Sequence, residues 1–160
     1  MLGIMLSGGK LMDEGLYGCI FTPPLRCKDK PKQLPQTSDS DLVLSKIILN
    51  KYADQEFSVA KTISKIPLWK NYFIVSESIC SPARAQKDKD LDDCDVLADH
   101  KLSEFKILQM PYGGMPLNTY RFNLNSFDFM DFTKHFIEAG ALLNLFGIVH
   151  RDIHLSLIHI

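Results

Sequence analysis

The alternation of apolar and polar positions predicts a β-hairpin near the start of the chain and a third strand after it. Residues 8–12 and 15–21 form two short strand patterns joined by a glycine-bearing turn, and Pro23-Pro24 closes the second one. The next segment, 27–40, is rich in Lys, Pro, Gln and Ser, so we expect a solvated loop. A strand pattern then returns over 42–48.

Helical periodicity follows the third strand. Over 53–66 the apolar residues recur at helical spacing, and Pro67 is a typical stop signal. Further strands are predicted over 72–75 and 105–110. The segment between them contains a charge-dense run, so we expect 84–104 to be a solvated insertion.

A longer helix is predicted in the last third of the chain. Ser126 is a candidate N-cap, and Gly147 is a candidate end. The apolar stripe of this helix consists of Phe129, Phe132, Phe136, Ala139 and Leu143. The order of elements predicts an α+β fold, with a sheet-rich lobe followed by the beginning of a helical lobe.

Composition narrows the class of protein. The 160 residues are 46% hydrophobic and 23% charged, which is typical of an ordinary globular domain. The net charge of −1 gives no electrostatic reason to expect nucleic acid or a membrane as a partner. The apolar start, 1–6, is too short for a signal peptide, and no segment has the roughly 18 apolar residues of a membrane span, so we expect a cytoplasmic protein.

The four cysteines carry no recognisable framework. Cys19, Cys27, Cys80 and Cys94 are unevenly spaced and contain no Cys-x-x-Cys pair, so neither a disulfide scaffold nor a zinc ribbon is indicated. We expect reduced thiols.

The clearest motif directly follows the predicted long helix. Residues 147–153, Gly-Ile-Val-His-Arg-Asp-Ile, resemble the catalytic loop of eukaryotic-type protein kinases. The resemblance implies that Asp152 is the base that accepts the substrate hydroxyl proton. It also implies that Arg151 ties the loop to an acidic or phosphorylated activation segment, and that His150 packs beneath the loop.

Other parts of the kinase pattern occur upstream in the expected order. The turn containing Gly15, Tyr17, Gly18 and Ile20 resembles the second half of the glycine-rich loop, although Asp13 replaces its first glycine. Glycines there let backbone N–H groups approach phosphates closely.

The resemblance also supplies an ion pair. Lys46 stands where the phosphate-binding strand lysine belongs, and Glu56 is the natural helix carboxylate to hold it. The separation of ten residues is shorter than usual, and a trimmed first helical turn would accommodate it.

Residues 110–114, Met-Pro-Tyr-Gly-Gly, resemble the hinge between the two kinase lobes. Backbone groups around Gln109, Met110 and Tyr112 would then bind the adenine edge, and Cys19 and Ile20 would cover the adenine ring. The residue that guards the back pocket is either Leu108 or Gln109.

Together these residues imply a kinase N-lobe over 1–110, with an antiparallel five-stranded sheet and helix C, a hinge at 111–114 and the start of a C-lobe over 115–154. The pattern from Gly15 to Pro23, followed by Cys27, further resembles kinases of large DNA viruses. The implied activity uses ATP and Mg²⁺ to phosphorylate a Ser/Thr hydroxyl of a protein substrate, with Ser/Thr as the default.

The sequence departs from the family after Asp152. Leu157 replaces the magnesium-binding Asn, and no Asp-Phe-Gly follows. Residues 155–160 are similar to a translated sequencing adapter, so we expect the natural protein to continue beyond His154 and the fragment to be inactive.

Alternatives remain open. One is a pseudokinase or nucleotide-binding scaffold, and another is a kinase-like phosphotransferase acting on small molecules. His150 and His154 are four residues apart, as in helical zinc sites, but Gly147 argues against a helix through them and we expect no metal there.

Overall fold

The computed structural model describes residues 9–29, 42–84, 86, 91–123 and 125–160. The expectations for residues 1–6, for most of the polar loop 27–40 and for the densest charges of the insertion lie outside the described residues. The chain divides into two units. Unit 1 combines Met1–Lys61 with Val75–Tyr112, and unit 2 combines Thr62–Ile74 with Gly113–Ile160.

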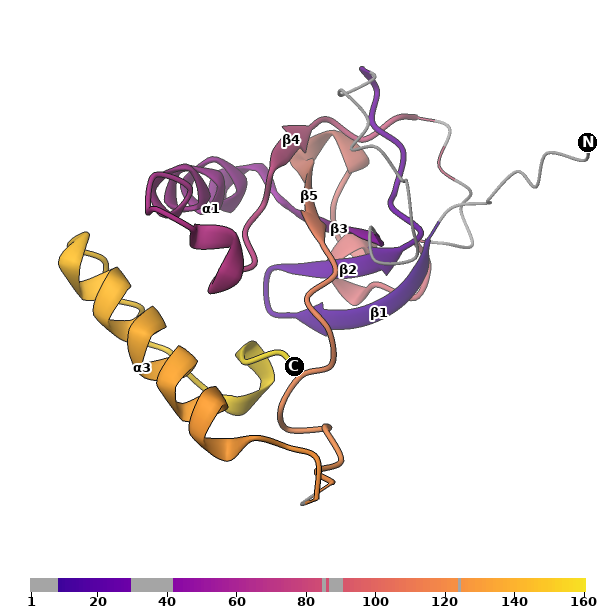
Figure 1. Cartoon of the computed structure of the whole chain (residues 1–160). Helices are drawn as coiled ribbons and strands as arrows, with labels where there is room; N and C mark the ends of the chain where they lie inside the picture. The colour runs from indigo at the N-terminus through magenta and orange to yellow at the C-terminus, as the bar shows by residue number, and fades with distance from the viewer. Residues whose placement is uncertain (1–8, 30–41, 85, 87–90, 124) are drawn as a thin grey trace, which may run out of the picture. The chain divides into compact units, whose positions relative to one another are not determined.

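An antiparallel sheet forms the centre of unit 1, as Figure 1 shows. Within the described residues it has five strands in the order β1-β2-β3-β5-β4. The prediction of an α+β chain with a five-stranded antiparallel sheet is therefore confirmed. The strands are β1 (Lys10–Gly15), β2 (Gly18–Thr22), β3 (Val43–Leu49), β4 (Ser78–Cys80) and β5 (Phe105–Pro111).

The strand register separates two sets of side chains because neighbours along a strand point to opposite faces. Lys46 lies opposite Ile20 on β2 and opposite Leu108 on β5, so these three share one face. The next row, Cys19, Ile47 and Ile107, lies on the other face. We call these the Lys46 face and the Ile47 face.

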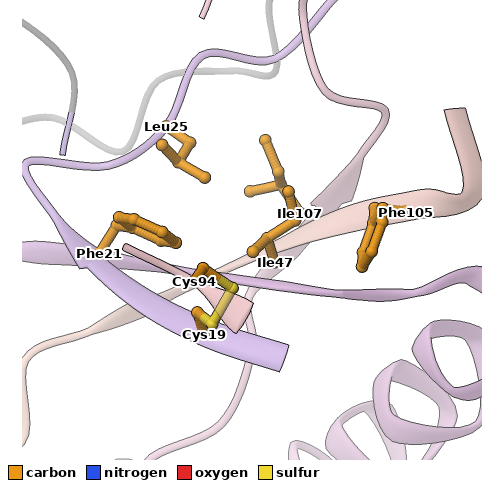
Figure 2. Close-up of a cluster of buried hydrophobic side chains, with 7 residues drawn as sticks. All are labelled: Cys19, Phe21, Leu25, Ile47, Cys94, Phe105 and Ile107. Carbon is orange, nitrogen blue, oxygen red and sulfur yellow. A yellow bond between two sulfur atoms is a disulfide. The ribbon is translucent and has the colours of Figure 1, made fainter. Parts of the chain in front are cut away.

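The Ile47 face carries the larger core. Phe21, Ile47 and Ile107 are fully buried in it, and Figure 2 shows these side chains gathered around the Cys19–Cys94 bond. Leu91, Val96 and Leu97 pack against the same cluster. The prediction that 84–104 is a solvated insertion was therefore wrong for these apolar residues, whereas the described charged residues Asp92, Asp93 and Asp95 are exposed.

Two disulfides cross this side of unit 1, joining Cys19 to Cys94 and Cys27 to Cys80. Among the described residues no free cysteine remains. The expectation of reduced thiols was wrong because the partners are 75 and 53 residues apart and meet only when distant segments fold together. Cysteine spacing along the chain contains no such information.

Helix α1 (Asn50–Ile63) covers part of the Lys46 face. Its buried residues, Ala53 and Ala60, are seven apart and therefore lie on the same side of the helix. Ala53 packs with Ile48 and Leu108. The predicted range, 53–66, began and ended three residues late, because the helix starts immediately after β3 and Ile66 is buried in the turn that follows the helix.

The strand expected over 72–75 is absent. A short 3₁₀ helix, η2 (Trp69–Asn71), ends there, and the N–H groups of Tyr72 and Phe73 donate to the carbonyl oxygen of Trp69. The edge strand β4 forms later, at Ser78–Cys80. Apolar character alone suggested a strand, but these backbone groups already have local hydrogen-bond partners.

Unit 2 contains the long helix α3 (Phe129–Leu145). Its N-cap is Asp128, whose side chain accepts hydrogen bonds from the N–H groups of Met130 and Asp131, so the expectation of a Ser126 cap was wrong. Gly147, at φ +71°, follows the helix end. No residue of α3 is buried; Phe129 and Phe136 on its apolar stripe remain 49% and 43% exposed.

The remaining elements are short. They are the helix α2 (Asp95–Ala98) and the 3₁₀ helices η4 (Leu102–Glu104) and η5 (Leu155–Leu157). Within unit 2, the N–H of Met115 donates to the carbonyl oxygen of Ile160, and the N–H of Ile160 donates back to Met115. None of the described helices combines the length and apolar character needed to cross a membrane.

Candidate functional site

An ion pair between Lys46 and Glu56 marks the candidate site in unit 1. The Lys46 Nζ atom lies 2.9 Å from Oε1 and 2.8 Å from Oε2 of Glu56. The side chains are 27% and 35% exposed, so the pair is partly shielded and still accessible to a ligand. The contact expected from the sequence therefore forms, while its role remains a prediction.

The short sequence separation of this pair follows from the connection between two elements. Strand β3 ends at Leu49 and α1 begins at Asn50, with no loop between them. Glu56 is consequently in the second turn of the helix and faces back toward β3. The ten-residue separation is therefore accommodated by a direct connection from β3 to α1, and a first turn trimmed relative to the family stays a prediction.

The surroundings of Lys46 follow from the sheet register. Ile20 and Leu108 flank it on neighbouring strands; Ile20 is half-buried and Leu108 is fully buried. Gln109 points to the opposite face, where its Oε1 accepts a hydrogen bond from the Ser78 hydroxyl at 2.9 Å. Of the two candidates for the back-pocket residue, Leu108 lies on the Lys46 face and Gln109 does not.

Cys19 does not share this face. It is fully buried on the Ile47 face, where it forms the disulfide with Cys94. The expectation that Cys19 covers an adenine ring beside Ile20 was therefore wrong, since adjacent strand residues point in opposite directions. Ile20 is the one of the two whose side chain lies on the Lys46 side.

The turn between β1 and β2 lies next to this face. Gly15 pairs with Gly18, and the turn residues Leu16 and Tyr17 are exposed. A Cβ atom at Gly18 would overlap the carbonyl oxygen of Ile47, whereas one at Gly15 would meet its nearest neighbour at 3.7 Å. Gly18 is therefore required by strand packing, and the space beside Gly15 is open.

Tyr17 has a contact that the sequence did not predict. Its ring centroid lies 4.4 Å from that of Tyr52 in the first turns of α1. Tyr52 itself packs against the small core of the Lys46 face. The turn is thus connected to the helix that carries Glu56, and Tyr52 was missed because no local motif marks it.

The predicted hinge begins within β5. Met110 is half-buried, lies on the Lys46 face opposite Leu44, and packs against the same small core as Leu108. The N–H of Tyr112 donates to the carbonyl oxygen of Leu42 at 2.7 Å. Its side chain is 41% exposed. The backbone donor of Tyr112 is therefore already used within the chain.

The predicted catalytic loop lies in unit 2, whereas Lys46, Glu56 and the residues around them lie in unit 1. The side chains of His150, Arg151 and Asp152 are all exposed. The N–H of Asp152 points at Nδ1 of His150, at 3.4 Å. Arg151 has φ +64°, an uncommon conformation for a residue other than glycine.

The magnesium ion implied by the resemblance stays a prediction. Among the described residues, the one group of three potential ligands within reach of each other is Glu14, Cys19 and Cys94. Two of its members are joined in a disulfide, whereas magnesium prefers oxygen ligands in octahedral geometry.

Among the described residues, two groups have a shifted pKa, and both lie away from the candidate site. In unit 2, the hydrogen bond that the Tyr72 hydroxyl donates to Glu138 raises the pKa of Tyr72. In unit 1, the contact with His100 lowers the pKa of Glu104, with a further contribution from the N–H of Lys101. Neither shift marks a catalytic acid or base.

Comparison with known proteins adds no identification. No family model matches the chain, and no curated protein shows a significant match.

Proposed function

We propose that this chain is the nucleotide-binding part of a protein kinase whose intact form transfers the γ-phosphoryl group of ATP to a Ser/Thr hydroxyl of a protein substrate. The observation that carries the proposal is the Lys46–Glu56 ion pair on a five-stranded antiparallel sheet. A strand lysine held by a helix carboxylate is the arrangement that positions phosphates in this family.

The pair supports nucleotide binding through charge and accessibility. Lys46 is a cation on the central strand β3, and contact with both oxygens of Glu56 restricts where its ammonium group can lie. A fixed cation attracts phosphate oxygens more effectively than a mobile surface lysine, because less conformational freedom is lost on binding. The partial exposure of the pair leaves the cation available to a ligand.

The β1–β2 turn supplies the second part of the argument. Gly18 begins β2 two residues before Ile20, which pairs with Lys46 on the neighbouring strand β3, so the turn lies two residues along β2 from the cation's partner. The open space beside Gly15 allows a ligand to approach the backbone there. Ile20 would then offer an apolar contact to the base.

For the chemical step, we propose Asp152 as the base that accepts the substrate hydroxyl proton. The positive φ of the preceding Arg151 supports a functional loop, since such strained conformations cluster at active sites. Because Leu157 stands where the family has a metal-binding Asn, we expect the 160-residue chain to bind nucleotide without turnover.

A second candidate is a pseudokinase that binds nucleotide or a partner without catalysis. Asp13 at the first glycine position favours it, because its carboxylate would stand near the phosphates. The sequence of the gene beyond the codon for His154 separates the two candidates. An Asn three residues on and a downstream Asp-Phe-Gly favour the enzyme, and their absence favours the pseudokinase.

The direct test is nucleotide binding by calorimetry with ATP and with Mg-ATP. We expect the wild-type chain to bind, Lys46→Met to lose at least about tenfold in affinity, and Glu56→Gln to lose less. Lys65→Met is the matched control, because it removes an exposed lysine that lies outside β3. Equal affinities in wild type and Lys46→Met, or no binding by the folded wild type, would refute the proposal.

A further inference from the structure

The two disulfides differ in how far they are shielded from solvent. Cys19 and Cys94 are 0% and 1% exposed, and both belong to the core cluster drawn in Figure 2. Cys27 and Cys80 are half-buried. Because thiol–disulfide exchange requires in-line attack by a thiolate on a sulfur atom, a small thiol can reach the second bond more easily than the first.

Backbone hydrogen bonds hold the two sides of the Cys27–Cys80 bridge together independently of the sulfur atoms. The N–H of Lys28 donates to Ser81 and the N–H of Ala83 donates to Arg26, both at 2.8 Å. The Gln86 side chain also bonds the backbone of Arg26 in both directions. After reduction, these bonds would keep Cys27 and Cys80 near each other, which favours reclosure.

The Cys19–Cys94 bridge has a different setting. Cys19 on β2 packs with Phe21 and Ile47, and Cys94 immediately precedes α2. A reductant reaches these sulfur atoms only if the segment around Cys94 first separates from the sheet. Opening this bond therefore requires disruption of the core, whereas opening Cys27–Cys80 does not.

We propose that Cys27–Cys80 is a reversible modification site for small thiols of the glutathione class, while Cys19–Cys94 is a permanent structural bond. A thiolate attacks one sulfur of the Cys27–Cys80 bond, forms a mixed disulfide with that cysteine and releases the other as a thiolate. A second thiol then attacks the mixed disulfide. The products are two protein thiols and one oxidised dimer of the small thiol, so two electrons pass to the protein.

The experiment follows the order in which the bonds open. The oxidised full chain is incubated with increasing concentrations of reduced glutathione, and then of dithiothreitol, without denaturant. Free thiols are alkylated at each point, and peptide mass spectrometry locates the label. We expect Cys27 and Cys80 to be labelled at least about tenfold faster than Cys19 and Cys94, and to regain their bond when oxidised glutathione is added.

Two variants separate local opening from unfolding. Cys19→Ser/Cys94→Ser retains only the exchangeable bond, and Cys27→Ser/Cys80→Ser retains only the buried one. The first should react with glutathione at the wild-type rate for Cys27 and Cys80, and the second should resist it. Labelling of all four cysteines at one rate, or earlier labelling of Cys19 and Cys94, would overturn the proposal.

Discussion

Gly18 lies so close to the carbonyl oxygen of Ile47 on the neighbouring strand that a Cβ atom at residue 18 would overlap it. This contact is between β2 and β3, so moving it would disturb the strand that carries Lys46. Gly15, its pairing partner across the turn, has no such neighbour. The neighbouring strand therefore leaves no room for a side chain at residue 18, whereas a side chain at residue 15 would fit.

Alanine substitutions at the two glycines should therefore differ in their effect on stability. We expect Gly18→Ala to lower the free energy of unfolding by about 1–3 kcal/mol, because the backbone of β3 must move to admit the methyl group. Gly15→Ala should change it by no more than about 0.5 kcal/mol. Urea unfolding followed by circular dichroism measures both. Equal losses in the two variants would contradict the packing argument.

The Lys46–Glu56 pair should contribute little to stability. Both side chains are about one-third exposed, and ion pairs in that setting typically couple by less than about 1 kcal/mol. A double-mutant cycle with Lys46→Met, Glu56→Gln and the double variant measures the coupling. A small coupling energy together with a large loss of nucleotide affinity in Lys46→Met indicates a functional pair, whereas a coupling of several kcal/mol would indicate a structural one.

The sequence predicted the strands whose side chains alternate or whose apolar runs are bounded by turn residues. The β1–β2 hairpin, β3 and β5 were found near their observed positions, and Lys46 and Glu56 were placed in contact. These features depend on local patterns. The strand expected at 72–75 failed because its apolar residues follow a 3₁₀ turn that already satisfies the backbone.

The features that the sequence missed depend on contacts between distant segments. Cys94 meets Cys19 only after the segment between β4 and β5 folds over the Ile47 face. Tyr52 meets Tyr17 only because α1 starts directly after β3. Neither contact changes the local pattern of either partner, so no periodicity or motif could reveal it.

Removal of either disulfide should destabilise the chain. The loops closed by Cys19–Cys94 and Cys27–Cys80 span 75 and 53 residues, and the chain-entropy estimate is about 4 kcal/mol for each. Cys19→Ala/Cys94→Ala should lose more than Cys27→Ala/Cys80→Ala, because it also leaves a void in the buried cluster. Urea midpoints of oxidised samples compare the two. A larger loss for the half-buried pair would contradict this order.

The N-cap of α3 can be tested by comparing alanine substitutions at Asp128 and at Ser126, two residues earlier. Asp128 accepts hydrogen bonds from Met130 at 3.0 Å and Asp131 at 2.9 Å, so Asp128→Ala should cost about 1 kcal/mol of helix stability. Ser126→Ala should cost almost nothing, since Ser126 does not cap the helix. Thermal unfolding followed at the helical circular dichroism signal distinguishes them, and a larger effect at Ser126 would reassign the cap.

The contact between His100 and Glu104 should make stability depend on pH at the acidic end. Their side-chain atoms lie 3.0 Å apart, and this contact is the main cause of the lowered pKa of Glu104. A carboxyl group whose pKa is lower in the folded state contributes stability above its unfolded pKa, at roughly pH 4.3 and higher. That contribution is lost as the pH falls through the folded pKa.

His100→Ala should therefore raise the pKa of Glu104 toward its ordinary value, although the N–H of Lys101 still lowers it somewhat. Carboxyl-carbon NMR titration measures the change. His154→Ala is the control, because His154 contacts Ser156 instead. Since Glu104 ends η4 immediately before β5, the variant should also lose stability above pH 5 and converge with wild type at lower pH. A pKa of Glu104 that is the same in both variants would show that the histidine contact does not form in solution.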